Sequence, residues 1–192
     1  MSGNPYLEWP ARTYVFIVRG TPLLAQLFLV YYGLSQFVAI RHSLLWPLLR
    51  DPYWCALITL SLNLAAYSAE IFRGGLLSVL PGPIEAGRAC GMSRILLYRR
   101  IILPLAIRQA LPGYGNDIIS MTKATSLYWI ITISEITGVS SKIISDTYRV
   151  TEVFIVAAAI YMAINFVLSR AIALVENRLG PTRVNRMWHY RK

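Results

Sequence analysis

Charge-free apolar runs of membrane-spanning length limit what this chain can fold into. The run from Thr21 to Ile40 has twenty residues without a charged side chain. At about 1.5 Å per residue, a helix of that length matches the ~30 Å hydrocarbon core of a bilayer. Only 15% of the residues are charged and the mean hydropathy is +0.50, whereas soluble domains carry about 25% charged residues. The sequence therefore predicts an all-α membrane protein, a bundle of about four transmembrane helices.

The predicted spans belong to one transmembrane domain, residues 1–192. They cover residues 21–40, 53–72, 111–136 and 153–174. The third span holds charged residues and Pro112, so we expect a broken helix whose polar groups turn away from lipid. Prolines and charges interrupt residues 1–20, which are predicted to lie along the headgroups as an interfacial segment. A disordered start is the alternative for the first ten residues.

Basic residues are distributed unevenly about these spans. Fourteen of the nineteen Lys and Arg residues fall in the N-terminal segment, in and around the polar loop 81–104, and in the basic tail 175–192 together with Arg170 near the end of the last span. Four fall on the opposite side, and Lys123 lies within a span. The positive-inside rule therefore predicts that the loop and the C-terminus are cytoplasmic. The formal net charge is +10. Because the basic residues lie between apolar runs, we expect them to contact membrane lipid and not nucleic acid.

The chain shows no catalytic or metal-binding pattern. Cys55 and Cys90 have no further cysteine or histidine at metal-ligand spacing. There is no G-x-x-x-x-G-K-[ST] phosphate loop, so the chain is not expected to hydrolyse ATP or to be an enzyme. We expect no cofactor on this chain, and any uphill transport must be driven by a partner or an ion gradient.

The polar segment EAGRACGMSRILLYRRIILP, residues 85–104, is suited to contact a partner. Ala86 and Gly87 are small enough for another surface to approach the backbone, and Gly91 permits a sharp turn between two short helices. Pro104 interrupts the helical hydrogen bonds as the chain returns to the membrane. The same features fit an amphipathic hairpin whose cations face lipid phosphates, and these local properties do not decide between the two.

The spacing of this segment resembles the EAA motif of permease subunits of ATP-binding-cassette (ABC) importers. That motif reads Glu-Ala-Ala, three residues, Gly, nine residues, Ile, one residue, Leu-Pro. The matching residues are Glu85, Ala86, Gly91, Ile101, Leu103 and Pro104. Gly87 replaces the second alanine, which keeps the position small but loosens the helix by up to about 1 kcal/mol. Arg88 completes the predicted docking residues.

Three further blocks narrow the resemblance to polar amino acid permeases. They are RGTPLLAQLFLVYYGL at 19–34, NLAAYSAEIFRGG at 63–75 and GNDIISMTKATSL at 115–127. Among these permeases, importers of histidine, basic amino acids and opines are the subgroup expected first. The family usually has five spans, and four are counted here, beginning near the family's second span.

The resemblance implies a set of partners. The EAA loop would form a coupling helix that docks on a cytoplasmic ABC ATPase, and the ATPase would use Mg-ATP. A second permease subunit, identical or not, would complete the pathway, and a periplasmic binding protein would deliver the solute. The location implied is the bacterial inner membrane, crossed several times. The alternatives are a non-transporting scaffold that binds a cytoplasmic partner through its basic loop, and an ion-driven carrier, which would usually carry two related halves.

Two stripes of polar side chains follow helical spacing in the second and third spans. They consist of Thr59, Asn63, Tyr67 and Glu70, and of Asn116, Ser120 and Lys123. Such stripes are costly toward lipid, so they should face the bundle interior or a water-filled path. In a solute path, Lys123 would meet a carboxylate and Glu70 an ammonium group. The alternative, favoured for the charged residues, is structural pairing of Glu70 with Arg73, and of Lys123 either with Asp117 across a helix break or with a partner subunit.

Overall fold

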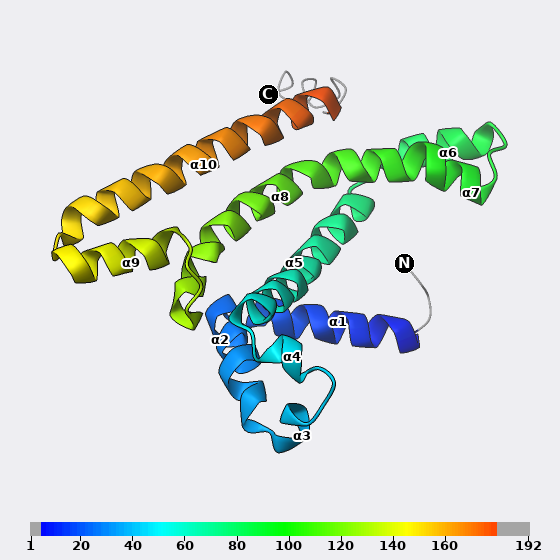
Figure 1. Cartoon of the computed structure of the whole chain (residues 1–192). Coiled ribbons are helices and arrows are strands. Elements are labelled where there is room, and N and C mark those ends of the chain that lie inside the picture. The colour runs from blue at the N-terminus through cyan, green and yellow to red at the C-terminus, as the bar shows by residue number, and fades with distance from the viewer. Residues whose placement is uncertain (1–4, 180–192) are drawn as a thin grey trace. The chain divides into compact units, whose positions relative to one another are not determined.

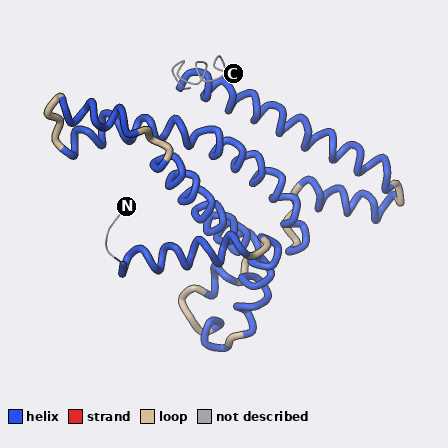
Figure 2. Tube along the Cα trace, turned by 180° about the vertical axis from the view of Figure 1, so that it is seen from behind, coloured by secondary structure: helices blue, strands red, loops and turns tan. Residues whose placement is uncertain are grey.

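The computed structural model describes residues 5–179, and every regular element in that range is a helix (Figure 2). In chain order the α-helices of Figure 1 are α1 Pro5–Gly20, α2 Leu23–Phe28, α3 Val38–Arg41, α4 Trp46–Leu49, α5 Pro52–Leu77, α6 Pro81–Ala89, α7 Arg94–Leu97, α8 Leu103–Ala124, α9 Ile136–Thr147 and α10 Val150–Leu179. The all-helical prediction is confirmed. Most of the predicted basic tail, from residue 180 on, lies outside the described residues.

Two of these helices, α5 and α10, are long and apolar enough to cross a membrane. They contain the predicted spans 53–72 and 153–174. A third candidate arises if residues 8–20 and 23–36, which are bent by 105° at their junction, count as one span. The number of spans and their limits stay predictions.

The apolar run 21–40 is not one straight helix. After α2, it continues as a π-helical turn Leu29–Gly33 and a 3-10 turn Leu34–Gln36, and then becomes extended at Phe37. Its start is separated from α1 because Pro22 disfavours helical geometry at the preceding residue. The chain therefore bends where the sequence analysis expected a span to begin.

The third predicted span, 111–136, is broken at a different point from the one expected. Helix α8 runs without interruption through Pro112 and ends at Ala124. A 3-10 helix Thr125–Ile131 follows, and Thr132 closes it with a left-handed φ of 68°. Close packing supports α8 around the proline, because a Cβ on Gly115 would lie 2.5 Å from Ile172 Cγ2.

The chain divides into two compact units. The first comprises residues 1–67 and 119–165, and the second comprises residues 68–118 and 166–192. The core of the first unit brings together side chains from α2, α5 and the 3-10 helix: Leu27, Ala56, Tyr128 and Ile131, with Tyr31, Leu60 and Ile133 against them. In the second unit, the end of α5 packs on the first half of α8, and the hairpin formed by α6 and α7 precedes α8 (Figure 1).

Candidate functional sites

The second unit contains the segment that matches the EAA spacing, folded as a helical hairpin, residues 81–102. Helix α6 ends in a Schellman motif, in which the N–H of Met92 donates to the carbonyl of Gly87 at 3.1 Å and the N–H of Gly91 donates to the carbonyl of Arg88 at 2.9 Å. Gly91 has a φ of 73°, which favours glycine because it has no Cβ. The expected turn between two short helices is therefore present at Gly91.

Helix α7 starts with a side-chain cap and runs into α8. The hydroxyl of Ser93 accepts a hydrogen bond from the N–H of Leu96 at 3.4 Å. Residues Tyr98–Ile102 then form a π-helical turn immediately before α8. Because Pro104 has no N–H, the hydrogen-bond ladder must change here, and the expected interruption takes the form of a π-turn.

Gly87 is the point at which the two arms of the hairpin meet. It is buried, and a Cβ added to it would lie 2.6 Å from Leu97 Cδ1 and 2.7 Å from Ile101 Cδ1. The departure from the EAA pattern therefore coincides with a close contact between the arms. Leu97, only 5% exposed, was not singled out from the sequence, although its side chain is the main contact of this glycine.

The opposite side of the hairpin is open. Exposed positions are Glu85, Ala86, Arg88, Gly91 and Leu103, while Ile101 and Pro104 are partly buried. Ile95, at the tip of the hairpin, is 82% exposed. The hairpin also exposes Arg88, Arg94, Arg99 and Arg100, and apolar and arginine side chains together are typical of a protein contact.

The polar stripe on α5 lies against the N-terminal helices of the first unit. Thr59 and Asn63 are buried. The Asn63 amide donates to Oε1 of Gln26 at 3.1 Å, and the Gln26 amide donates to the carbonyl of Val18 at 2.7 Å. These bonds join α5 to α2 and α1. Gln26 was not singled out, but a lone amide inside the apolar stretch LLAQLF was the available signal.

Tyr67 and Glu70, the C-terminal members of that stripe, also contact other side chains of the same chain. The guanidinium of Arg19 lies over the Tyr67 ring, 5.1 Å from its centroid. In the second unit, Arg73 pairs with both carboxylate oxygens of Glu70, with Nε 2.8 Å from Oε2. The structural pairing expected for Glu70 is confirmed.

Lys123 is placed differently. It lies in the last turn of α8, and α8 is continuous from Asp117 to Lys123, so the helix break proposed between them is absent. Six residues along a helix is not one of the spacings, three or four, that bring side chains together. Lys123 instead lines an open cavity of about 330 Å³ in the first unit.

This cavity is walled by the 3-10 helix, α9 and α10 in addition to α8. Its lining residues are Lys123, Ser126, Thr137, Phe154, Ala157, Ala158 and Tyr161. The stripe residues predicted for a solute path are Asn63, Tyr67, Glu70, Asn116, Ser120 and Lys123, and of these only Lys123 lines the cavity. A cavity of this volume falls in the range of about 300–1,000 Å³ typical of small-molecule sites.

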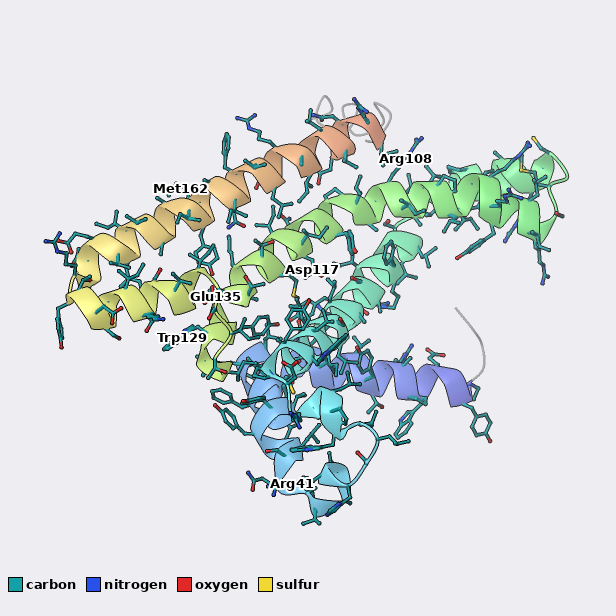
Figure 3. The ribbon with its side chains drawn as sticks, in the orientation of Figure 1. Arg41, Arg108, Asp117, Trp129, Glu135 and Met162 are labelled. Carbon is teal, nitrogen blue, oxygen red and sulfur yellow. The ribbon has the colours of Figure 1, made fainter. Side chains whose placement is uncertain are left out.

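Glu135, labelled in Figure 3, holds two of the lining residues of the cavity, Thr137 and Tyr161. Its carboxylate accepts from the N–H groups of Thr137 and Gly138, both at 2.8 Å, and so caps the start of α9. The Tyr161 hydroxyl donates to Glu135 Oε2 at 2.6 Å, and the Thr137 and Tyr161 hydroxyls are 3.3 Å apart. Glu135 falls within the predicted third span, 111–136, and had no predicted role. A carboxylate two residues before a Thr-Gly helix start was the available signal.

Comparison with known proteins identifies the family. Residues 1–181 match the binding-protein-dependent transport system inner membrane component, and the chain belongs to that family. It is 62% identical to the octopine transport system permease protein OccM of Rhizobium meliloti over 178 residues. This matched region covers 93% of this chain and 73% of OccM. It is 52% identical over 182 residues to the nopaline transport system permease protein NocM of Agrobacterium fabrum, covering 94% and 76%.

A solved structure agrees with these relatives. The crystal structure of an amino acid ABC transporter with histidines contains a chain with a TM-score of 0.82 to this one and 36% identity, covering 93% of this chain and 79% of that chain. The protein is therefore a permease subunit of an ABC importer, an inner-membrane transport component that works with an ATPase and a binding protein. The scaffold and ion-driven carrier alternatives are not favoured. Permeases of this class are transport subunits rather than enzymes.

Proposed function

We propose that this chain forms part of the pathway by which an importer moves opines or basic amino acids across the inner membrane. The observation that carries the proposal is its 62% identity with an octopine permease, supported by 52% identity with a nopaline permease. Both named solutes are arginine derivatives, so each combines a guanidinium group with carboxylates. The proposed solutes are therefore small molecules that carry both charges.

The cavity supports a solute of this kind. It is large enough for a small molecule, and Lys123 supplies a cation for a carboxylate. The proposal keeps Lys123 from the predicted path and assigns Asn63 and Tyr67 to helix packing, because their polar groups contact Gln26 and Arg19. A role for Asn116 and Ser120 in the path stays a prediction.

Competition during uptake tests the proposed solutes. The complete importer, with its ATPase, partner permease and binding protein, would be reconstituted into vesicles and supplied with labelled octopine. We expect unlabelled arginine and nopaline to compete and glutamate not to compete. Uptake of an acidic or purely apolar amino acid, with no uptake of octopine or arginine, would overturn the proposal.

We further propose that the hairpin docks a separate cytoplasmic ABC ATPase, which binds and hydrolyses Mg-ATP, while this chain binds no cofactor. The docking residues are Glu85, Ala86, Arg88, Gly91, Ile101, Leu103 and Pro104, with Ile95 added at the tip. Gly87, predicted as a docking residue, is buried between the arms and would act by shaping the hairpin. The proposal is supported by the motif spacing, by the exposed outer side of the hairpin and by the Gly87 contact that fixes its arms together.

A pull-down in detergent tests the docking surface. Ile95→Asp places a charge at the 82% exposed tip, and Tyr148→Asp makes a matched change at an 87% exposed position in the turn between α9 and α10. We expect only Ile95→Asp to reduce ATPase capture. Equal capture of both variants would show that the ATPase does not contact the hairpin tip.

The proposed orientation places the hairpin and the C-terminus in the cytoplasm, with the binding protein on the other side and a second permease subunit in the membrane. Cys90 is exposed in the hairpin and Cys55 is buried, so the native chain carries a suitable reporter. A membrane-impermeant maleimide should label Cys90 in inside-out vesicles. Labelling of Cys90 in right-side-out vesicles would show that the hairpin faces the other side of the membrane, and would overturn the proposed orientation.

A further inference from the structure

The cavity contains a second polar group besides Lys123 that is suited to a charged solute. Tyr161 is one of its lining residues, and the Tyr161 hydroxyl contacts Glu135 and Thr137. All of these groups belong to the first unit. Tyr161 is partly buried on α10, and the carboxylate of Glu135 is held in position by the two backbone N–H groups at the start of α9.

Accounting for the protons fixes the direction of these hydrogen bonds. A carboxylate only accepts, so the single Tyr161 proton is donated to Glu135 at 2.6 Å. The contact of 3.3 Å between the Thr137 and Tyr161 hydroxyls must then run from Thr137 to Tyr161. Thr125, a further hydroxyl beside Tyr161, donates to the carbonyl of Thr122 at 2.8 Å, so the Tyr161 oxygen keeps a lone pair for another donor, and the adjacent carboxylate makes it more electron-rich.

An acceptor with a negative charge behind it favours a cationic donor. The side chain of arginine ends in a guanidinium with several N–H donors, whereas its neutral isostere citrulline carries a urea in the same place. Hydrogen bonds to charged groups are worth about 1.5–3 kcal/mol, against about 1 kcal/mol for neutral pairs. This wall should therefore discriminate between the two solutes, while Lys123 serves the carboxylate that both share.

We propose that Tyr161, oriented by Glu135, is the residue of this permease that selects solutes with a cationic side chain, by accepting a hydrogen bond from the guanidinium or ammonium group. The proposal rests on the proposed function and refines it, because it assigns the cationic end of the solute to a residue. It replaces Glu70 in the role suggested by the sequence, since Glu70 is paired with Arg73. Tyr161 would contact the solute, and Glu135 would be a positioning residue.

The test measures solute binding by the detergent-purified permease–ATPase complex without its binding protein, so that only the permease selects. The dissociation constants of labelled arginine and labelled citrulline would be compared for wild type and two variants. Tyr161→Phe removes the acceptor and keeps the ring. Tyr128→Phe is the matched control, because Tyr128 is buried in the core of the same unit and its hydroxyl has no hydrogen-bond partner among the described residues.

We expect Tyr161→Phe to weaken arginine binding by more than about tenfold, the factor that corresponds to loss of one charge-assisted hydrogen bond, and citrulline binding by no more than about fivefold, the factor for a neutral hydrogen bond, so that the preference for arginine falls. Tyr128→Phe should leave both constants unchanged. A parallel loss for both solutes in Tyr161→Phe would show a structural role only, and an unchanged arginine constant would show no contact; either result overturns the inference. Failure of the wild-type complex to bind arginine or octopine would instead overturn the proposed function, and the inference with it.

One further variant tests the positioning role. Glu135→Asp retains the charge and a favoured helix cap but shortens the side chain, so that it withdraws from Tyr161. We expect it to reduce the preference for arginine over citrulline while assembly with the ATPase is normal. An unchanged preference in Glu135→Asp would remove Glu135 from the proposal and leave the Tyr161 result to stand by itself.

Discussion

Gly75 of α5 lies against the backbone of Ala106 in α8, so closely that a Cβ on Gly75 would be 2.6 Å from the Ala106 carbonyl oxygen. The same Cβ would be 3.0 Å from the Cβ of Ala110. Small residues thus allow two helices of the second unit to approach at the level of their backbones. Backbone atoms cannot move aside as the end of a flexible side chain can, so this contact specifies glycine.

Gly75→Ala should therefore destabilise the protein, while Gly74→Ala should stabilise it. Alanine gains up to about 1 kcal/mol of helix propensity at either position. At Gly74 there is no atom within 4 Å of the added Cβ, whereas at Gly75 the clash with Ala106 should cost about 1–3 kcal/mol. The midpoint of thermal unfolding in detergent measures both. Equal shifts for the two variants would contradict the close contact.

The hairpin offers a similar comparison within one helix. Gly87→Val should push Leu97 and Ile101 away and separate the two arms, whereas Gly82→Val meets open space. We expect the first variant to reduce ATPase affinity by about tenfold, equivalent to roughly 1.4 kcal/mol, and the second to reduce it much less. Affinity measured by titration of the ATPase decides this. Normal affinity of Gly87→Val would show that docking does not depend on the packing of the arms.

The bond between Gln26 and Asn63 should appear as a coupling energy. A double-mutant cycle with Gln26→Leu and Asn63→Leu isolates the pair, because each single variant leaves one amide group without its partner. Interhelical hydrogen bonds in membrane proteins average about 0.6 kcal/mol, so a coupling of about 0.5–1.5 kcal/mol is expected. Unfolding in a mixed-micelle system would measure it, and additive single effects would argue against the bond.

Replacement of Lys123 separates charge from packing in the cavity. Lys123→Met keeps the length of the side chain and removes the cation, so we expect the KM for uptake to rise by about tenfold or more, as for loss of a charge-assisted hydrogen bond. Lys123→Arg should retain most of the affinity. Uptake kinetics of the assembled importer distinguish the variants. Unchanged uptake by Lys123→Met would remove Lys123 from the solute path.

Loss of the Glu135 side chain should lower the stability of the fold. Glu135→Ala removes the cap of α9 and the acceptor of the Tyr161 hydroxyl, and the cap by itself is worth about 0.5–2 kcal/mol. Glu135→Asp should cost less because aspartate still caps. Glu152→Ala, at an exposed position in the first turn of α10, is the control and should change thermal stability little. A decrease in thermal stability as large for Glu152→Ala as for Glu135→Ala would show that the Glu135 cap makes no specific contribution.

Local features of this protein followed from the sequence. The turn at Gly91 and the pair formed by Glu70 and Arg73 depend on residues no more than a few positions apart, where backbone geometry and helical spacing decide the outcome. The two helices of membrane-spanning length follow from the continuity of their apolar runs. The family resemblance also rested on spacing, and the comparisons confirm it.

The tertiary structure decided the rest, because those contacts join residues far apart in the chain. Nothing in the local pattern gives Asn63 its partner Gln26, 37 residues away, or brings Tyr161 to Glu135, 26 residues away. Pro112 predicted a break that close packing of α8 removes. Sequence thus determined the helices and the hairpin turn through local backbone preference and hydrophobicity, whereas packing alone determined which polar groups are used between helices and which remain to line a cavity.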